Sequence, residues 1–218
     1  IAVLDAGFYG VDKFSAFDSL WTEGRILGTW DFVDADAYVF DGHFHGMSVL
    51  SAMGGNIPGK LIGTAPKASY WLLRSEDDSS EFLIEEDNWI AAAEFADSAG
   101  VDVINSSLGY STFDDPAMNH TYSDMDGNTT RVTRGANLAA SRGILVVSSA
   151  GNEGRPANPW KYIVAPSDGE QVIGVGAVNK TGIPATFTSY GPASDGAVKP
   201  NVTAVGWNTI LQNSNGTV

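Results

Sequence analysis

The chain has 218 residues, of which 43% are hydrophobic, and it carries a formal net charge of -14 from 26 acidic and 12 basic residues. This length and composition predict one domain around a single core. The negative charge argues against a surface that collects phosphate groups, so neither nucleic acid nor an anionic membrane is an expected partner. Because the chain has no cysteine, a disulfide, a thiolate metal site and a cysteine nucleophile are all excluded. No apolar run approaches the roughly 20 residues of a membrane helix, and the N-terminal residues lack the pattern of a signal peptide.

The predicted elements alternate between strands and helices. Short β-branched runs predict strands at residues 1–4, 29–33, 69–73, 101–104, 144–148 and 172–178. Helical spacing and glycine stop signals predict helices at residues 85–99 and 133–141, and a further helix begins at His45. The polar stretch 111–131 is typical of a long surface loop. This alternation indicates an α/β fold with a mostly parallel sheet, in which ligands bind beyond the carboxyl ends of the strands.

Two side chains with catalytic chemistry stand at such positions. Asp5 ends the first predicted strand, although an aspartate so close to a glycine is equally compatible with a turn. His45 opens a helix whose small residues, Gly46, Ser51 and Ala52, would let it approach the sheet closely. His43 and His45 would lie on one side of an extended strand, but neither a Glu-x-x-His partner nor a thiolate accompanies them. We therefore expect no zinc site here.

A third candidate follows the apolar run 144–147. Asn152 lies in the sequence Ala150-Gly151-Asn152-Glu153-Gly154. An asparagine between glycines is compatible with a simple turn. Its side-chain amide could also donate to a developing negative charge, which is the role of an oxyanion-hole donor.

In their order and type, these three sites resemble the subtilisin-like serine peptidases. Four further segments strengthen the resemblance, which spans nearly the whole chain: Gly63–Ala68, Asn105–Gly109, Phe187–Pro192 and Asp195–Val202. The resemblance implies a three-layer subtilisin-like fold, with a mostly parallel sheet and helices on both faces. It also implies a serine endopeptidase that acts on polypeptides and is exported. Such enzymes need no cofactor for the chemistry but often bind calcium, at a site that this sequence does not indicate.

The resemblance assigns roles to individual residues. Asp5 would orient His45, and His45 would act first as general base and then as general acid. Asn152 would donate to the oxyanion. Ser107, Leu108 and Gly109 resemble the strand that pairs with the substrate backbone, a contact that gives affinity with little choice of sequence.

The chain departs from the family pattern at the nucleophile. The family string Gly-Thr-Ser-x-x-x-Pro is absent, and the nearest match, Gly216-Thr217-Val218, ends in a side chain with no nucleophilic group. We therefore expect residues 1–218 to form a single peptidase domain that lacks its nucleophile-bearing helix and an upstream segment. Such a chain is expected to be inactive and to self-associate through the apolar patch that the missing helix would bare. Two minor departures lie in the helix that begins at His45. The family favours threonine at the position of Met47 and a smaller residue at the position of Leu50.

Other interpretations remain open at this point. A pseudopeptidase or peptide-binding module would use the same cleft without turnover. A nucleotide-binding domain is disfavoured, because no strand is followed by a phosphate-binding glycine motif. The oxygen-rich segment Ser123–Asn128 has incomplete spacing for an EF-hand, which favours a solvated turn over a calcium loop. Glu85, Glu86 and Asp87 fit an acidic first helical turn, and their position after a loop also fits a cleft rim.

Overall fold

A computed structural model describes residues 1–218, which form two compact units. Unit 1 contains Ile1–Ser79 together with Ile210–Val218, and unit 2 contains Ser80–Thr209. No helix in the structure combines the length and the apolar character needed to cross a bilayer.

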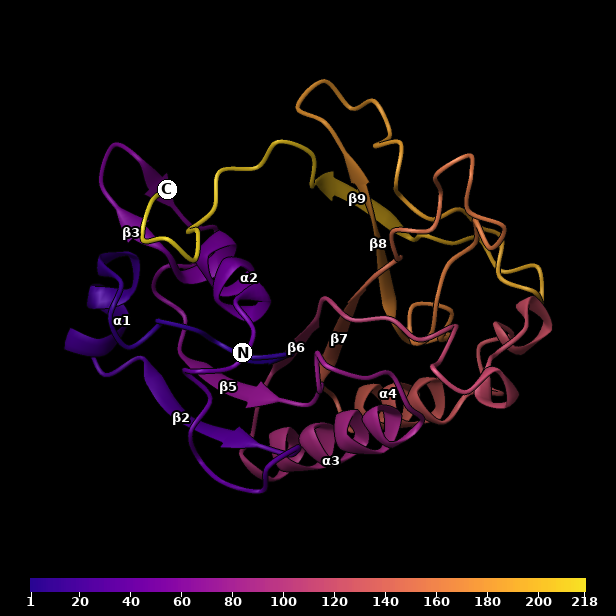
Figure 1. Ribbon diagram of the computed structural model, residues 1–218, viewed down its shortest axis with the longest axis horizontal. Helices are drawn as coiled ribbons and strands as arrows, with labels where there is room; N and C mark the ends of the chain where they lie inside the picture. The colour runs from indigo at the N-terminus through magenta and orange to yellow at the C-terminus, as the bar shows by residue number, and fades with distance from the viewer. The chain divides into compact units, whose positions relative to one another are not determined.

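Unit 1 is built on three parallel strands in the order β2-β5-β1 (Figure 1). The carboxyl ends of these strands are in register, so Asp5, Arg74 and Asp31 lie side by side at one edge. The strands are β1 (Ala2–Asp5), β2 (Ile26–Asp31) and β5 (Tyr70–Arg74). Around them lie a 3-10 turn, two helices and a short hairpin: η1 (Ser15–Phe17), α1 (Asp18–Thr22), α2 (His45–Gly54), β3 (Asn56–Ile57) and β4 (Leu61–Ile62).

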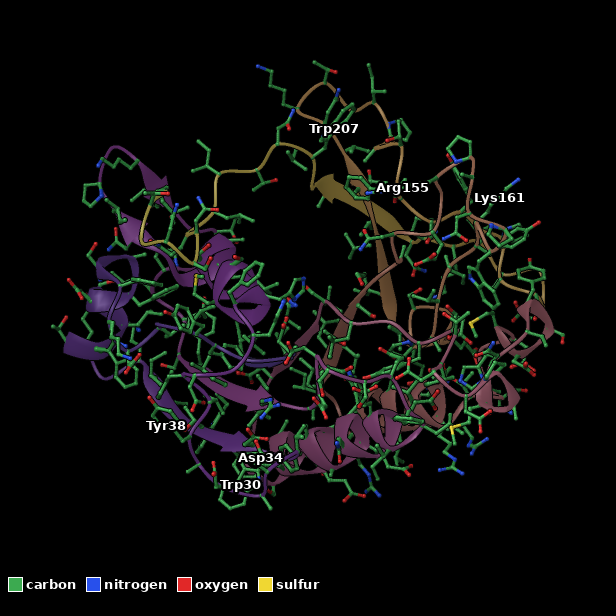
Figure 2. The ribbon with its side chains drawn as sticks, in the orientation of Figure 1. Trp30, Asp34, Tyr38, Arg155, Lys161 and Trp207 are labelled. Atoms are coloured by element: carbon green, nitrogen blue, oxygen red, sulfur yellow. The ribbon has the colours of Figure 1, made fainter.

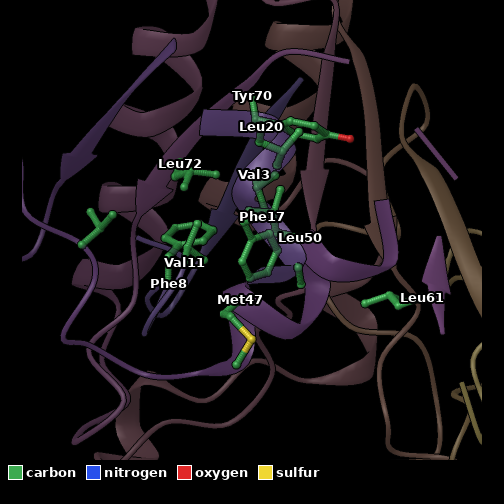
Figure 3. Close-up of a cluster of buried hydrophobic side chains, with 12 residues drawn as sticks. Val3, Phe8, Val11, Phe17, Leu20, Met47, Leu50, Leu61, Tyr70 and Leu72 are labelled. Atoms are coloured by element: carbon green, nitrogen blue, oxygen red, sulfur yellow. The ribbon is translucent and has the colours of Figure 1, made fainter. Parts of the chain in front are cut away.

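The core of unit 1 lies between α2, η1, α1 and the sheet (Figure 3). Met47 and Leu50, the two positions where the sequence departs from the family preference, are both fully buried in this core. They pack in one cluster with side chains from the strands and the N-terminal helices, including Val3, Phe17, Leu20, Tyr70 and Leu72. The larger residues on α2 therefore serve as core residues of this unit, where their burial is stabilising.

The loop that follows β2 is tied to the end of that strand and to β5. The carboxylate of Asp31 accepts hydrogen bonds from the backbone N–H groups of Val33 and Asp34 and so starts a turn. Arg74 joins this turn to β5 through ion pairs with Asp31 and Asp34, at 2.8 and 2.7 Å. Figure 2 labels Trp30, Asp34 and Tyr38 in this region.

The C-terminal segment of the chain returns to unit 1 beside α2 (Figure 1). Gln212 is buried there, and its backbone N–H donates to the Ser51 hydroxyl at 2.9 Å. Its carbonyl accepts from the Ser48 hydroxyl at 3.0 Å. Two polar residues of α2 are therefore used to attach a segment more than 160 residues away in sequence.

Unit 2 contains four parallel strands in the order β6-β7-β8-β9. Helices α3 and α4 lie against each other (Figure 1), with Gly135 leaving room for Ile90 at their contact. The elements are α3 (Ile84–Ser98), β6 (Val103–Ser106), η2 (Pro116–Met118), η3 (Tyr122–Asp124), α4 (Arg131–Ser141), β7 (Leu145–Ser149), β8 (Ile173–Val178) and β9 (Val202–Val205).

The predicted α/β class with parallel strands is confirmed, whereas several boundaries differ. The strand predicted at residues 29–33 lies at 26–31, because the turn made by Asp31 ends it. The strand predicted at 101–104 begins at Val103, because the N–H of Val101 still bonds to the carbonyl of Ala96 at the end of α3. Helix α4 begins at Arg131 and not at residue 133, since the Thr130 side chain caps it. The loop predicted at 111–131 ends at residue 130 and contains two 3-10 turns.

Candidate active site

Asp5 and His45 are in direct contact in unit 1. The buried carboxylate of Asp5 lies at the end of β1, and its Oδ1 is 2.8 Å from His45 Nδ1. The same oxygen accepts the backbone N–H of Ala6 at 2.8 Å, which fixes the orientation of the carboxylate. His45 is the first residue of α2. The strand end and the helix start that the sequence singled out thus bring an acid and an imidazole together.

Two glycines allow this close approach. A Cβ atom at Gly46 would lie 2.5 Å from the carbonyl oxygen of Gly7 and 2.8 Å from the Cβ of Asp5. Gly7 itself has a φ of +146°, and a Cβ there would lie 2.5 Å from the backbone nitrogen of His43. Any side chain at either position would push α2 away from the end of β1.

The electrostatics of the pair favour a histidine that can take up a proton. The hydrogen bond to Asp5 raises the pKa of His45 above its ordinary value and outweighs the opposing effect of burial. The His45 side chain is 44% exposed, and its Nε2 has no hydrogen-bond partner. Asp5 Oδ2 is buried without a partner, so this carboxylate interacts with the ring through Oδ1 alone. With Nδ1 held by Asp5, Nε2 is the nitrogen that can accept a proton from a neighbouring hydroxyl.

In unit 2, the predicted substrate-binding residues follow β6. Because β6 and β7 are parallel and Ser106 pairs with Ser148, the residues after both strands lie at one edge of the sheet. Ser107 lines a cavity of about 240 Å³. The carbonyl of Leu108 accepts a hydrogen bond from the Ser149 hydroxyl at 3.3 Å, and Gly109 packs closely on Val164.

Asn152 lies in a firmly held turn after β7. The flanking Gly151 has a φ of +105°, and a Cβ at Gly154 would lie 1.9 Å from the carbonyl oxygen of Thr188. The N–H of Glu153 donates to the Ser189 hydroxyl at 3.0 Å. The Asn152 side chain is exposed and makes no hydrogen bond within the chain, so its amide is available as a donor.

The structure thus groups the predicted site residues in two sets. Asp5 and His45 belong to unit 1, whereas Asn152 and Ser107–Gly109 belong to unit 2. His43 contributes its Nδ1 as acceptor for the backbone N–H of His45 at 3.2 Å.

The acidic first turn of α3 contains a buried interaction that the sequence analysis missed. Glu85, Glu86 and Asp87 are in the first turn as predicted, but Glu85 and Glu86 are buried. Glu86 accepts the N–H of Val132 at 3.1 Å and lies 2.5 Å from His120 Nε2. The helical spacing of Glu86 from the buried Trp89 was the available signal, because residues three apart share a helix face.

Comparisons with known proteins cover the whole chain. A protein-family model described as the subtilase family (Peptidase_S8) matches residues 1–218. Thermitase from Thermoactinomyces vulgaris is 30% identical over 178 residues, which is 79% of this chain and 54% of thermitase. The serine protease AprX from Bacillus subtilis (strain 168) is 28% identical over 96% of this chain and 46% of its own length. The chain therefore spans about half the length of these curated relatives.

Solved structures agree in fold. The patellamide maturation protease PatA superposes with a TM-score of 0.72 at 20% identity, over 98% of this chain and 68% of that chain. A cold adapted subtilisin-like serine proteinase gives a TM-score of 0.68 at 19% identity, over 99% of this chain and 66% of that chain. At sequence identities of 19 and 20%, the similarity to these structures shows the fold alone.

Proposed function

The chain belongs to the subtilase family, and we therefore propose that it supplies three groups of a serine endopeptidase: the orienting carboxylate, the catalytic histidine and the oxyanion donor. The observation that carries the proposal is the 2.8 Å contact between Asp5 Oδ1 and His45 Nδ1. Asp5 holds the imidazole in one orientation and stabilises the imidazolium that forms during the reaction.

Each remaining role follows from the chemistry of peptide hydrolysis. His45 Nε2 takes the proton of a serine hydroxyl as that oxygen attacks the scissile carbonyl, and it later returns the proton to the leaving amine. The exposed amide of Asn152 donates to the oxygen of the tetrahedral intermediate. The backbone of Ser107, Leu108 and Gly109 pairs with the extended peptide.

The serine nucleophile is not among the candidate residues of this chain. The nearest match to the family string, Gly216-Thr217-Val218, has valine as its third residue. We therefore propose that the 218 residues do not hydrolyse peptides by themselves and that the nucleophile lies beyond Val218. By the same family relation, we propose export from the cell.

A cleavage assay separates the enzyme from its alternative. A polypeptide that continues through a Gly-Thr-Ser string is expected to cleave casein, and its His45→Ala variant is expected to lose this activity. The valine at position 218 favours a second candidate, a pseudopeptidase that binds peptides in the same cleft. Casein binding without cleavage by the extended polypeptide would support that candidate and contradict the peptidase.

Calcium is the ion that the family relation implies, and carboxylates of unit 2 fit it by donor type. Glu81 and Glu85 have oxygen atoms within 4.8 Å of each other. Asp114 lies beside them, since its carboxylate accepts the N–H of Glu81 at 3.2 Å. Carboxylate oxygens are the ligands that calcium prefers. A bound calcium ion would offset the repulsion among these groups, and the proposed chemistry at His45 does not use it.

These carboxylates predict a pH-dependent stability. Burial, and then the charges of Glu85 and Asp114, raise the pKa of Glu81 from 4.5 to about 7. The folded state therefore favours the protonated form, and the free energy of unfolding should fall as pH rises from about 4.5 to about 7. Thermal melts of Glu81→Gln should lack this part of the decline, whereas Glu94→Gln, on the exposed side of α3, should retain it. Equal pH profiles for the two variants would contradict the assignment.

Self-association is a further proposal, supported by the edge of the unit 2 sheet. Strand β9 pairs only with β8, and all four of its residues are exposed, including Val202 at 51% and Val205 at 53%. An exposed apolar edge strand is a template for pairing with another chain. Light scattering is expected to show oligomers, and Val202→Lys is expected to shift the population to monomer. A monomeric unmodified chain would contradict the proposal.

A further inference from the structure

A pocket of about 510 Å³ opens in unit 1 next to the proposed base. Four parts of unit 1 form it: Tyr9 after β1, the loop before α2, the segment after β5 and the C-terminal segment. The side chains that matter for its chemistry are Tyr9, Asp41, His43, Phe44, Asp78 and Ser214.

The wall of this pocket is attached to His45. His43 lines the pocket and accepts the backbone N–H of His45, and the two imidazole rings are 6.4 Å apart between centroids. Phe44, which also lines the pocket, directly precedes His45 in sequence. The carbonyl of His43 in turn accepts the N–H of Tyr9 at 3.4 Å. A group held in the pocket would therefore lie beside the position where the proposed base acts.

The charges in the pocket are negative and unpaired. Asp41 and Asp78 are exposed, and neither makes an ion pair or a hydrogen bond within the chain. No lysine or arginine lines the pocket, so an anionic group would meet repulsion with no compensating contact. The pocket therefore favours a cation.

The shape of the lining favours an organic cation over a metal ion. Asp41, His43 and Asp78 are not among the residues whose ligand atoms converge within 4.8 Å, so they do not form a chelating set. Two aromatic rings stand in the wall instead, with Tyr9 42% and Phe44 46% exposed. Phe44 is braced by the His43 ring at a centroid distance of 4.5 Å. Aromatic faces attract ammonium and guanidinium groups, and separated carboxylates suit a long side chain with its charge at the end.

We propose that this pocket binds a lysine or arginine side chain of the substrate near the scissile bond, so that Asp41 and Asp78 direct the peptidase to basic substrates. The inference rests on the proposed function and narrows its substrate class. The carboxylates act by attraction, and the rings of Tyr9 and Phe44 contact the aliphatic part and the charged end of the side chain.

Binding can be measured on the 218-residue chain without any catalysis. The uniformly 15N-labelled chain is titrated with Nα-acetyl-arginine N-methylamide and, separately, with the citrulline analogue, which has nearly the same shape and no charge. Saturable shifts of the Tyr9, His43 and Phe44 backbone amides are expected with arginine. Citrulline should bind about tenfold more weakly, since two exposed ion pairs and a cation–π contact each contribute a few-fold. The arginine affinity should also fall at high salt.

Matched variants test the two carboxylates. The double variant Asp41→Asn, Asp78→Asn should bind arginine about tenfold more weakly, because both attractive charges are removed. Asp97→Asn with Asp102→Asn changes the net charge equally at exposed sites of unit 2 and should leave binding unaltered. Since neither aspartate of the pocket has a partner to lose, the double variant should fold, and the citrulline comparison requires no variant at all.

Three results would overturn the proposal. They are equal affinity for arginine and citrulline, absence of saturable shifts at the pocket amides, and displacement of arginine by calcium chloride at equal ionic strength. This assay is independent of the nucleophile. Arginine binding together with an extended polypeptide that cleaves nothing would reject the peptidase and leave the cation pocket, whereas cleavage of casein without arginine binding would reject the pocket alone.

Discussion

A serine-directed phosphonate is expected to leave the 218-residue chain unlabelled and to label a polypeptide that continues past Val218 through a Gly-Thr-Ser string. Phosphonates react with a serine whose hydroxyl proton is removed by a neighbouring base. Without that serine, hydrolysis should be lower by about a million-fold, the loss that subtilisin itself suffers when its serine is removed. Intact-mass spectrometry measures the labelling directly, and His45→Ala in the extended polypeptide provides the control that should also remain unlabelled.

The hydroxyl groups nearest to His45 in sequence are already engaged, which supports this expectation. Ser48 donates to the carbonyl of Gln212, and Ser51 donates to the carbonyl of Ser48 while accepting the N–H of Gln212. Both hydroxyls therefore hold the C-terminal segment on α2. Labelling of the short chain would contradict our assignment of the nucleophile. Ser214, which lines the pocket beside His43, would then be the first serine to replace.

The meeting of Asp5 and His45 could be predicted because its signals are local. A β-branched run ending in an aspartate marks a strand end, and a histidine before small residues marks a helix start. In a parallel α/β fold both kinds of position lie at the ligand-binding edge. Gly46 is among the small residues predicted to allow this approach, although only the structure shows that a Cβ there would lie 2.8 Å from the Cβ of Asp5.

The features that the sequence analysis missed depend on partners far away along the chain. Gln212 belongs to no periodic segment, and its burial comes from bonds to Ser48 and Ser51 on α2. The β9 residues are all exposed, so they lack the alternation that predicts a half-buried strand. Glu86 fits an acidic first helical turn, but its burial could not be predicted, because the residues that it bonds to, His120 and Val132, come from a loop and another helix.

Asp5→Asn is expected to lower kcat of the extended polypeptide by about ten thousand-fold, the loss that this exchange causes in a trypsin-like triad. An asparagine amide donates where the carboxylate accepts, so it would favour the ring tautomer with the proton on Nε2. That tautomer cannot take the serine proton through Nε2. Casein hydrolysis measures the effect, and a loss of less than tenfold would contradict the role of Asp5.

The same exchange in the 218-residue chain has a readout that does not need the nucleophile. The bond to Asp5 raises the pKa of His45 above 6.5 against the effect of burial, so its removal should lower that pKa. In the unmodified chain, the imidazolium form of His45 contributes stability that is fully present below about pH 6.5 and is lost as the pH rises through the raised pKa. Asp5→Asn should remove this contribution.

Asp31→Asn is the matched control for this measurement. Asp31 ends β2, which β5 separates from β1 in the sheet; it is buried and pairs with Arg74, but it makes no contact with His45. NMR titration of the His45 ring protons should therefore show a lowered pKa in Asp5→Asn and an unchanged one in Asp31→Asn. Equal shifts in both variants would mean that the general negative charge at the strand ends sets the pKa of His45. In that case Asp5 would not be the specific partner that the proposed mechanism requires.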